Sequence, residues 1–368
     1  MDEELDVMFG RIYKGKRVLV TGHTGFKGSW LVFWLQRLGA EVCGYALPAP
    51  TEPSHWDLLK LDVRSELADI RDAQTLEKVF SVFQPEIVFH LAAQPLVRLS
   101  YRDPVGTWST NIMGTLNVFE ACRKTKSVRA VINITSDKCY ENREWERGYN
   151  EDDAMGGHDP YSASKGCSEL LTSSYRNSYF NNATFGLKHQ TLLASCRAGN
   201  VIGGGDWAED RLIPDMMRAV AVGKPVDIRN PRATRPWQHV LESLGGYLLV
   251  GQKLLEGRAE CATGWNFGPA EDATLSVQEV AESIKRYWSR IDYRLAQVTD
   301  TPHEANLLKL DCTKARGLLG WSPVWNSDAT FGKTVGWYRE FYENGVLATE
   351  SDLIEYMNKI NFGDRKNG

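Results

Sequence analysis

The sequence has no long apolar run. Its apolar stretches, such as Trp30–Leu35, are far shorter than the ~18 residues that a membrane-spanning helix needs. The first ten residues, MDEELDVMFG, are acidic and lack the cationic start and apolar core of a secretory signal peptide. We therefore expect a cytoplasmic protein that does not act at a membrane.

An excess of basic residues is also missing. The chain has 43 Lys and Arg against 47 Asp and Glu, a net charge of -4, which argues against a nucleic-acid-binding surface. The seven cysteines are odd in number, and none has C-x-x-C spacing or histidines nearby. We expect buried, reduced thiols and no metal site.

What the sequence does contain is an alternation of strand and helix patterns in its first half. The expected strands are Arg17–Thr21, Glu41–Ala46, Ile87–Leu91, Ala130–Thr135 and Leu192–Ala198. The expected helices are Ser29–Leu38, Asp72–Phe83, Val105–Lys124 and Tyr161–Ser178. Strands separated by helices of this length predict an α/β fold with a doubly wound parallel sheet.

The pattern changes after Ala198. Glycines and prolines separate shorter elements, and helices are expected at Val277–Trp288 and Thr330–Glu343. We therefore predict a first domain over residues 1–198. Residues 199–368 are expected to form mainly a second, smaller α/β domain, with some segments returning to the sheet.

A glycine-rich turn, TGHTGFKG at Thr21–Gly28, lies between the first strand and the first helix. Its glycines allow a tight turn, a close approach to a pyrophosphate, and close packing of helix on strand. The helix N-terminus then favours the anion. The sequence thus predicts a Rossmann-type domain that binds NAD. The binding residues expected in this turn are Gly22, His23, Thr24, Gly25, Phe26, Lys27 and Gly28.

The second strand lacks the acidic residue that usually holds the adenosine ribose of NAD. No arginine for a 2′-phosphate stands there either, so we expect NAD to be held loosely. Lys27 could contact a phosphate or could be a solvated side chain. The further expected cofactor-binding residues are Asp69, Ile70, Leu91, Ala92, Ala93 and Asn111.

A catalytic set follows the strand at Ala130–Thr135. Ser136, Asp137 and Lys138 come directly after it, and Tyr161 and Lys165 open a helix downstream. Residues four apart on a helix share one face. The lysine is therefore expected to lower the tyrosine pKa, so that the phenol can take a proton from an alcohol. Ser136 would share the hydrogen bond to the reacting oxygen, and Lys165 would also reach the nicotinamide ribose.

These motifs (TGHTGFKG, LAAQ, TSDKCY and YSASK) resemble the extended short-chain dehydrogenase/reductase superfamily over nearly the whole chain. The resemblance implies an NAD-dependent enzyme that acts on a nucleotide sugar. In the nucleotide-sugar 4,6-dehydratases of this superfamily, an acid follows the catalytic Ser or Thr, and here it is Asp137. The 4-epimerases normally have no acid there. Asp137 therefore favours a dehydratase.

Longer runs, such as YSASKGCSELL and RAGNVIGGGDWAEDRLIPD, resemble the CDP-glucose 4,6-dehydratases in particular. This resemblance alone implies CDP-glucose as the substrate. The dTDP-glucose relatives have a glutamate base where Lys138 stands. It stays open whether Lys138 removes the C5 proton or stabilises the enolate as a cation.

The same resemblance implies residues that would hold the substrate, although each could be an ordinary surface residue. They are Gln94, Asn200, Arg211, Arg235, Asn266 and His303. It also implies a homodimer or homotetramer, in which the helices at Val105–Lys124 and Tyr161–Ser178 form a four-helix interface.

Two other functions stay open. A UDP-sugar 4-epimerase would share every feature except the need for Asp137. A non-catalytic NAD(P)-sensing protein could use the same fold, but the intact pair of Tyr161 and Lys165 argues against it.

Overall fold

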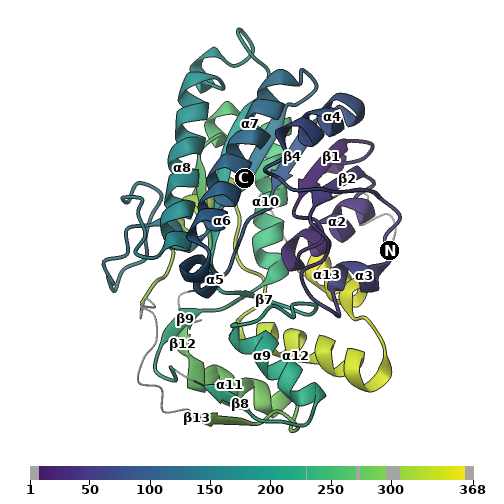
Figure 1. Ribbon diagram of the computed structural model, residues 1–368, viewed down its shortest axis with the longest axis vertical. Coiled ribbons are helices and arrows are strands. Elements are labelled where there is room, and N and C mark those ends of the chain that lie inside the picture. The colour runs from purple at the N-terminus through teal and green to yellow at the C-terminus, as the bar shows by residue number, and fades with distance from the viewer. Residues whose placement is uncertain (1–7, 229, 271–273, 296–306, 361–368) are drawn as a thin grey trace, which may run out of the picture.

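A seven-stranded parallel sheet forms the centre of the protein, in a computed structural model that describes residues 8–228, 230–270, 274–295 and 307–360 (Figure 1). The strand order is β11-β6-β5-β4-β1-β2-β3. The strands are β1 (Arg17–Thr21), β2 (Glu41–Ala46), β3 (Arg64–Leu67), β4 (Ile87–His90), β5 (Ala130–Ile134), β6 (Leu192–Ala198) and β11 (Gly264–Phe267). Their register is parallel throughout, for example Leu19 beside Val88.

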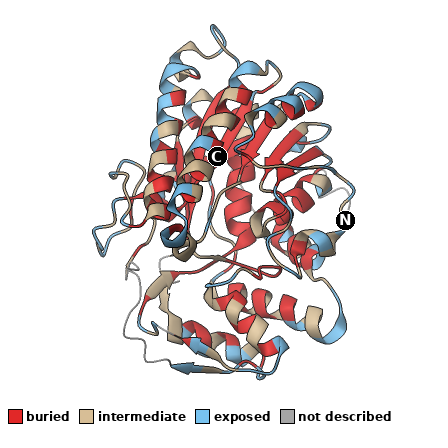
Figure 2. Cartoon of the chain, viewed as in Figure 1, coloured by how far each residue is buried: buried red, intermediate tan, exposed pale blue. Residues whose placement is uncertain are grey.

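Helices cover both faces of this sheet. On one face lie α2 (Phe26–Arg37) and α10 (Val240–Leu255); on the other lie α4 (Ala73–Phe83), α7 (Thr115–Lys124) and α8 (Pro160–Ser178). Successive strand side chains point to opposite faces. In β1, Val18 and Val20 join the first core, while Leu19 joins the second. The strands other than the edge strand β3 are accordingly buried on both sides (Figure 2).

The predicted α/β fold with a doubly wound sheet is confirmed, and β1, β2 and β6 have the predicted bounds. Two strands of the central sheet and one of the helices that cover it were not predicted. β3 (RSEL) is a largely exposed edge strand with no apolar pattern, and β11 is only four residues long. α10 is buried nearly all round, so it has no amphipathic stripe.

The helix expected over Val105–Lys124 is not a continuous α-helix. It consists of α6 (Pro104–Trp108), a π-helical turn at Ser109–Gly114, and α7. This turn contains Asn111, whose amide bonds the backbone of Gln94 and the hydroxyl of Ser164. The wider turn brings that side chain inward, which sequence periodicity does not indicate.

The second half of the chain contributes most of a smaller group of elements below the sheet in Figure 1. Its helices are α9 (Leu212–Ala221), α11 (Val277–Tyr287), α12 (Ser327–Asn344) and α13 (Thr349–Lys359). Its short strands form the pairs β7 (Val201–Ile202) with β10 (Gln238–His239), β9 (Thr234–Pro236) with β12 (Thr274–Ser276), and β8 (Val226–Ile228) with β13 (Tyr293–Leu295). β11 and α10 come from the same half but belong to the sheet layers. The division at residue 198 stays a prediction.

Short helical elements complete the described chain. They are α3 (His55–Leu59), α5 (Val97–Arg102), the 3₁₀ turns Met8–Arg11, Asp137–Cys139, Asn182–Thr184 and Ala259–Cys261, and a π-helical turn at Ala315–Leu319. None of the helices in the described residues has the length and apolar character needed to cross a bilayer.

Candidate active site

The turn between β1 and α2 has the shape of a pyrophosphate cradle. Gly22 has φ +75°, and a Cβ there would lie 2.8 Å from the backbone nitrogen of Ala92. A Cβ on Gly28 would lie 2.1 Å from the Gly22 carbonyl oxygen, so only glycine lets α2 approach this closely. Gly25 precedes α2, and none of the described side chains caps this helix. Its first N–H groups and positive dipole end therefore fit the pyrophosphate of NAD.

His23 points away from this cradle. Its Nε2 lies 2.7 Å from the Ser65 hydroxyl, and its ring packs edge-on to Trp56. A Cβ on Gly44 would lie 2.3 Å from the His23 ring, so β2 needs glycine at that point. Burial lowers the pKa of His23 to about 4, which leaves the ring neutral at pH 7. The His23 side chain is thus a packing group.

Lys27 extends from the first turn of α2 toward the candidate catalytic residues. Its Nζ lies 3.4 Å from the Tyr247 hydroxyl. Burial lowers the pKa of Lys27 to about 7, Arg211 lowers it further, and Asp137 acts in the opposite direction. The lysine therefore belongs to the electrostatic surroundings of the site and is not a freely solvated side chain.

The end of β4 borders the glycine turn, as expected for Leu91, Ala92 and Ala93. The Thr21 hydroxyl oxygen accepts hydrogen bonds from the backbone N–H groups of Leu91 and Ala92, at 3.1 and 3.2 Å. It also lies 2.7 Å from His90 Nδ1. These contacts fix the end of β4 beside the cradle.

Three other expected cofactor residues already have partners within the protein. Asp69 forms an ion pair with Arg71 at 2.6 Å. The Ile70 side chain packs against Gly114, and the Thr24 hydroxyl donates to the Leu47 carbonyl at 2.8 Å. The backbone carbonyls of Asp69 and Ile70 also accept hydrogen bonds, from Tyr45 and Asn117, and the role of these residues toward a cofactor stays a prediction.

Ser136 and Asp137 form a fixed pair after β5. The Ser136 hydroxyl donates to Asp137 Oδ1 at 2.9 Å and accepts from the Lys138 N–H at 3.2 Å. The Asp137 side chain lies against Gly199, where a Cβ would be 1.9 Å from Oδ2. Asp137 is 3% exposed. This carboxylate therefore has a defined position.

Tyr161 and Lys165 lie one helical turn apart at the start of α8. Asp159 caps this helix by accepting from the Ser162 N–H at 2.9 Å, and Pro160 is its first residue. Lys165 Nζ approaches the Ile134 carbonyl at 3.4 Å. Both side chains are buried, and α8 brings them to the end of β5.

The pKa of Tyr161 differs from the expectation. Burial raises it to about 12, and a hydrogen bond with Ser136 lowers it only in part. Lys165 is not the group that decides this pKa, and burial lowers the pKa of Lys165 itself to about 8. In the protein alone, desolvation of the phenolate outweighs the lowering effects of Ser136 and Arg211.

A cavity of about 330 Å³ ends at Asp137. Gly199 and Gln238 also line it, as do three basic side chains, Arg147, Lys309 and Arg316. Among the described residues, neither Tyr161 nor the glycine turn lines this cavity, so it adjoins the site from the Asp137 side.

Three of the expected substrate residues come near this part of the molecule. Asn200 follows Gly199 and has φ +48°. Arg211 forms an ion pair with Asp206 at 3.0 Å and acts electrostatically on both Tyr161 and Lys27. Arg235 lies on β9, next to the cavity residue Pro236.

The side-chain amides of two others make internal contacts. Asn266 is fully buried; its Oδ1 accepts from Tyr140, and its Nδ2 donates to two backbone carbonyls. The half-buried Gln94 amide pairs with Leu96 and Thr107. The role of both residues toward substrate stays a prediction. His303 lies outside the described residues.

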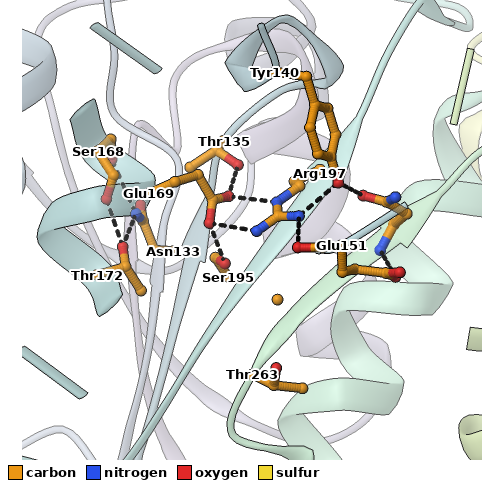
Figure 3. Close-up of polar contacts among 12 residues, drawn as sticks. Asn133, Thr135, Tyr140, Glu151, Ser168, Glu169, Thr172, Ser195, Arg197 and Thr263 are labelled. Carbon is orange, nitrogen blue, oxygen red and sulfur yellow. Dashed lines mark hydrogen bonds and ion pairs between the residues drawn. The ribbon is translucent and has the colours of Figure 1, made fainter. Parts of the chain in front are cut away.

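Some residues that contact the segments carrying the candidate catalytic side chains were not predicted from the sequence. The chief ones are Glu169 and Arg197, which form a buried ion pair at 2.9 Å between α8 and β6 (Figure 3). Arg197 could have been noticed as the single charge in the apolar strand LLASCRA. Glu169 stands four residues after Lys165, on the same face of the helix.

Comparisons with known proteins agree with this arrangement. The family model of GDP-mannose 4,6 dehydratase matches residues 19–334. A CDP-glucose 4,6-dehydratase of Salmonella typhimurium is 50% identical over 94% of this chain and 97% of that relative. A probable dTDP-glucose 4,6-dehydratase of Sinorhizobium fredii is 28% identical over 88% and 93%.

Solved structures have the same fold. The UDP-glucose 4-epimerase of Thermus thermophilus, in complex with NAD, has a TM-score of 0.71 and 27% identity, covering 88% of this chain and 99% of that one. The dTDP-glucose 4,6-dehydratase of Bacillus anthracis, also with NAD, has a TM-score of 0.73 at 19% identity, covering 90% and 98%. With the family model and the Salmonella relative, these findings identify the chain as a member of the nucleotide-sugar 4,6-dehydratase family.

Proposed function

We propose that this protein converts CDP-glucose to CDP-4-dehydro-6-deoxy-glucose with NAD as its cofactor. The observation that carries the proposal is the position of Asp137, a buried carboxylate that accepts a hydrogen bond from Ser136 at the end of β5. An acid here has a use in dehydration and none in 4-epimerisation. The nucleotide is assigned from the 50% identity to the CDP-glucose enzyme.

The roles of the side chains follow from their chemistry. Tyr161 accepts the O4 proton of glucose as a phenolate, the form that its raised pKa makes scarce in the protein alone. Ser136 shares the hydrogen bond to that oxygen. When bound at the glycine turn, NAD would supply a hydride acceptor for oxidation at C4 and a hydride donor for reduction at C6. The resulting ketone acidifies the C5 proton, and Asp137 protonates the C6 hydroxyl as water leaves. The net redox change is zero, and the enzyme is a lyase.

Lys138 has two possible roles in the elimination. As a neutral amine it removes the C5 proton; as a cation it stabilises the enolate. The turn at Asp137–Cys139 places it next to the acid in sequence, with its backbone N–H on Ser136. Both roles require that this turn keeps its shape.

Basic side chains suit the diphosphate. Arg211 keeps its charge because Asp206 opposes the effect of burial on its pKa. Arg235 offers a second guanidinium from β9. The basic lining of the cavity beside Asp137 fits an anionic substrate in the same way.

Three further features complete the proposal. NAD is held loosely, because β2 offers no acid to its ribose. The seven free cysteines suit a reducing cytoplasm.

A second copy packs on the exposed side chains of Val105, Met113 and Leu170, at α6, the π-helical turn and α8, giving a homodimer or a homotetramer.

Asp137→Asn tests the central role. The variant keeps the side-chain shape but cannot donate the proton, so elimination is expected to slow by about 10²- to 10⁴-fold. Formation of NADH in the first turnover should fall much less. Stopped-flow absorbance measures the first step, and mass spectrometry of the product measures the second.

Equal loss in both steps would contradict the assignment of Asp137 as the acid. A C4 epimer formed without loss of water would instead support the UDP-sugar 4-epimerase. Full activity of Tyr161→Phe would remove the whole catalytic scheme.

A further inference from the structure

A buried ion pair lies directly beneath the candidate catalytic residues. Tyr161, Lys165 and Glu169 follow one another at four-residue intervals on α8 and therefore share a face. Glu169 faces Arg197 of β6, and each is only 4% exposed. Figure 3 shows this pair at the centre of a network of polar contacts.

Each oxygen of the Glu169 carboxylate accepts two hydrogen bonds. Oε1 accepts from the Thr135 hydroxyl at 2.5 Å and from Arg197 Nε at 2.9 Å. Oε2 accepts from the Ser195 hydroxyl at 2.7 Å and from Arg197 Nη2 at 2.9 Å. Burial alone would raise the pKa of Glu169, but the charge of Arg197 and these hydrogen bonds hold it below its ordinary value. The carboxylate is therefore ionised and fixed in orientation.

A third nitrogen of Arg197 reaches the C-terminal end of the turn Asp137–Cys139, which carries the candidate acid and is called the catalytic turn below. Its Nη1 donates to the Tyr140 hydroxyl at 2.6 Å, and that hydroxyl donates to Asn266 Oδ1 at 2.8 Å. The Asn266 amide in turn donates to the backbone carbonyls of Tyr149 and Asp311. Tyr140 is thus connected to β6 and β11 together.

Two of these contacts, at Thr135 and Tyr140, lie on either side of the catalytic turn in the sequence. Thr135 directly precedes Ser136, and Tyr140 directly follows the turn Asp137–Cys139. The ion pair is therefore hydrogen-bonded to both ends of the segment that carries the candidate acid and Lys138. Through Glu169 it also fixes the helix that carries Tyr161.

We propose that Glu169 and Arg197 form a positioning unit that sets the catalytic turn against α8. Thr135 is its contact on the Ser136 side, and Tyr140 is its contact on the Lys138 side. This inference rests on the proposed function, because it concerns the alignment of that reaction's groups. It adds four positioning residues to the site, which act through the catalytic residues.

Stability alone is a weak reason for such a pair. Taking two charges out of water is costly, and apolar replacements of buried ion pairs are often neutral or stabilising. Catalysis has a stricter need, since a misplacement of ~1 Å can cost about 10²-fold in rate. A bidentate pair with every lone pair occupied meets that need.

The test uses two substitutions that each remove one hydroxyl group and leave the ion pair in place. Thr135→Val removes the hydrogen bond to Glu169, and Tyr140→Phe removes those to Arg197 and Asn266. Glu169→Gln is avoided, because it would leave the Arg197 charge buried and uncompensated. Thr135→Val is expected to slow C4 oxidation about 10-fold, measured as NADH formation in the first turnover. Tyr140→Phe is expected to slow elimination about 10-fold while NADH formation changes little. The KM for CDP-glucose should stay within about twofold in both, and Thr135→Ser, which keeps the hydroxyl, should restore the oxidation rate.

Tyr356→Phe is the matched control. Tyr356 is also fully buried, and its hydroxyl donates to Glu242 at 2.8 Å, outside the catalytic turn. It should lower the midpoint of thermal unfolding and leave both steps unchanged. If Thr135→Val and Tyr140→Phe do only the same, the positioning proposal is overturned. If the wild-type protein turns over no nucleotide sugar, the proposed function itself fails, which is a different result.

Discussion

At the scale of single residues, the site depends on close approaches that only glycine permits. Gly199 is the clearest case, because the Asp137 carboxylate occupies the space where a side chain would begin. Its φ is not in the left-handed region, so the need is for space and not for backbone freedom. The position of the candidate acid is therefore set partly by a residue that has no side chain.

Gly199→Ala is expected to displace Asp137 and to lower kcat by about tenfold or more, because the added Cβ would lie 1.9 Å from Oδ2. Gly336→Ala is the control: it adds a methyl group on α12 with nothing within 4 Å, and its kcat should equal that of the wild type. Steady-state kinetics with CDP-glucose measure both. Wild-type kcat in Gly199→Ala would show that Asp137 does not need its present position.

Lys27 gives a second prediction at this scale. Burial lowers its pKa to about 7, so the cation is present below that pH and is lost as the pH rises through it. If Lys27 supports the pyrophosphate, the Kd for NAD should rise between pH 6 and pH 8.5. In Lys27→Met, binding should be weaker at pH 6 and nearly independent of pH.

Calorimetric titration with NAD across this pH range makes the measurement. Lys126→Met, on an exposed loop before β5, is the control that should bind like the wild type. An unchanged Kd in Lys27→Met at pH 6 would remove Lys27 from the cofactor site.

At the scale of elements, α10 connects the sheet to the C-terminal helices through one buried carboxyl. Glu242 accepts from the backbone N–H groups of Val324 and Trp325, at 3.0 and 2.7 Å, and from the Tyr356 hydroxyl of α13. Burial raises its pKa to about 7, and these hydrogen bonds oppose that rise. No basic side chain appears among these described partners.

The raised pKa predicts a pH dependence of stability. The folded state holds the Glu242 proton more tightly than the unfolded chain does. The contribution of this protonation to the free energy of unfolding is therefore full below about pH 4.5 and is lost as the pH rises to about 7. Between pH 5 and pH 8 it amounts to about 2 kcal/mol. The Glu242→Gln side chain cannot titrate. Between pH 5 and pH 8 the free energy of unfolding of the wild type should therefore fall by about 2 kcal/mol relative to that of the variant. Urea denaturation at both pH values measures it, and parallel pH curves for the two proteins would contradict the prediction.

At the scale of the whole molecule, local patterns predicted the parallel sheet and five of its strands, but not the order of the strands. β2 and β6 were predicted with their full bounds because both are buried apolar runs. β3 and α10 were missed for opposite reasons: one has no apolar pattern, and the other is apolar on every side.

The candidate site was predictable where chemistry follows sequence spacing, as with Ser136, Asp137, Tyr161 and Lys165. It was not predictable where the contact depends on distant segments. Asn266 looked like a substrate residue, but its partners come from three other parts of the chain. The pKa of Tyr161 could not be predicted either, since it depends on burial that a sequence does not show.

The proposed oligomer is also tested at this scale. Met113 and Leu170 are 50% and 60% exposed. The double substitution Met113→Glu and Leu170→Glu should convert a dimer or tetramer to smaller species, because the charges would have to be buried in the interface. Leu187→Glu, at a residue 86% exposed elsewhere on the surface, is the control. Sedimentation velocity measures the mass, and a wild-type monomer would contradict the proposal.

The most direct test of the whole account is turnover of nucleotide sugars by the purified protein. CDP-glucose is incubated with and without added NAD, beside dTDP-glucose, UDP-glucose and GDP-mannose, and the products are identified by mass and, for an epimer of unchanged mass, by NMR spectroscopy. We expect a 4-keto-6-deoxy product, lighter by one water, from CDP-glucose and from none of the other three nucleotide sugars. Its yield should rise with added NAD. No product from any of the four, or an epimer of unchanged mass, would contradict the central claim that Asp137 makes this protein a dehydratase.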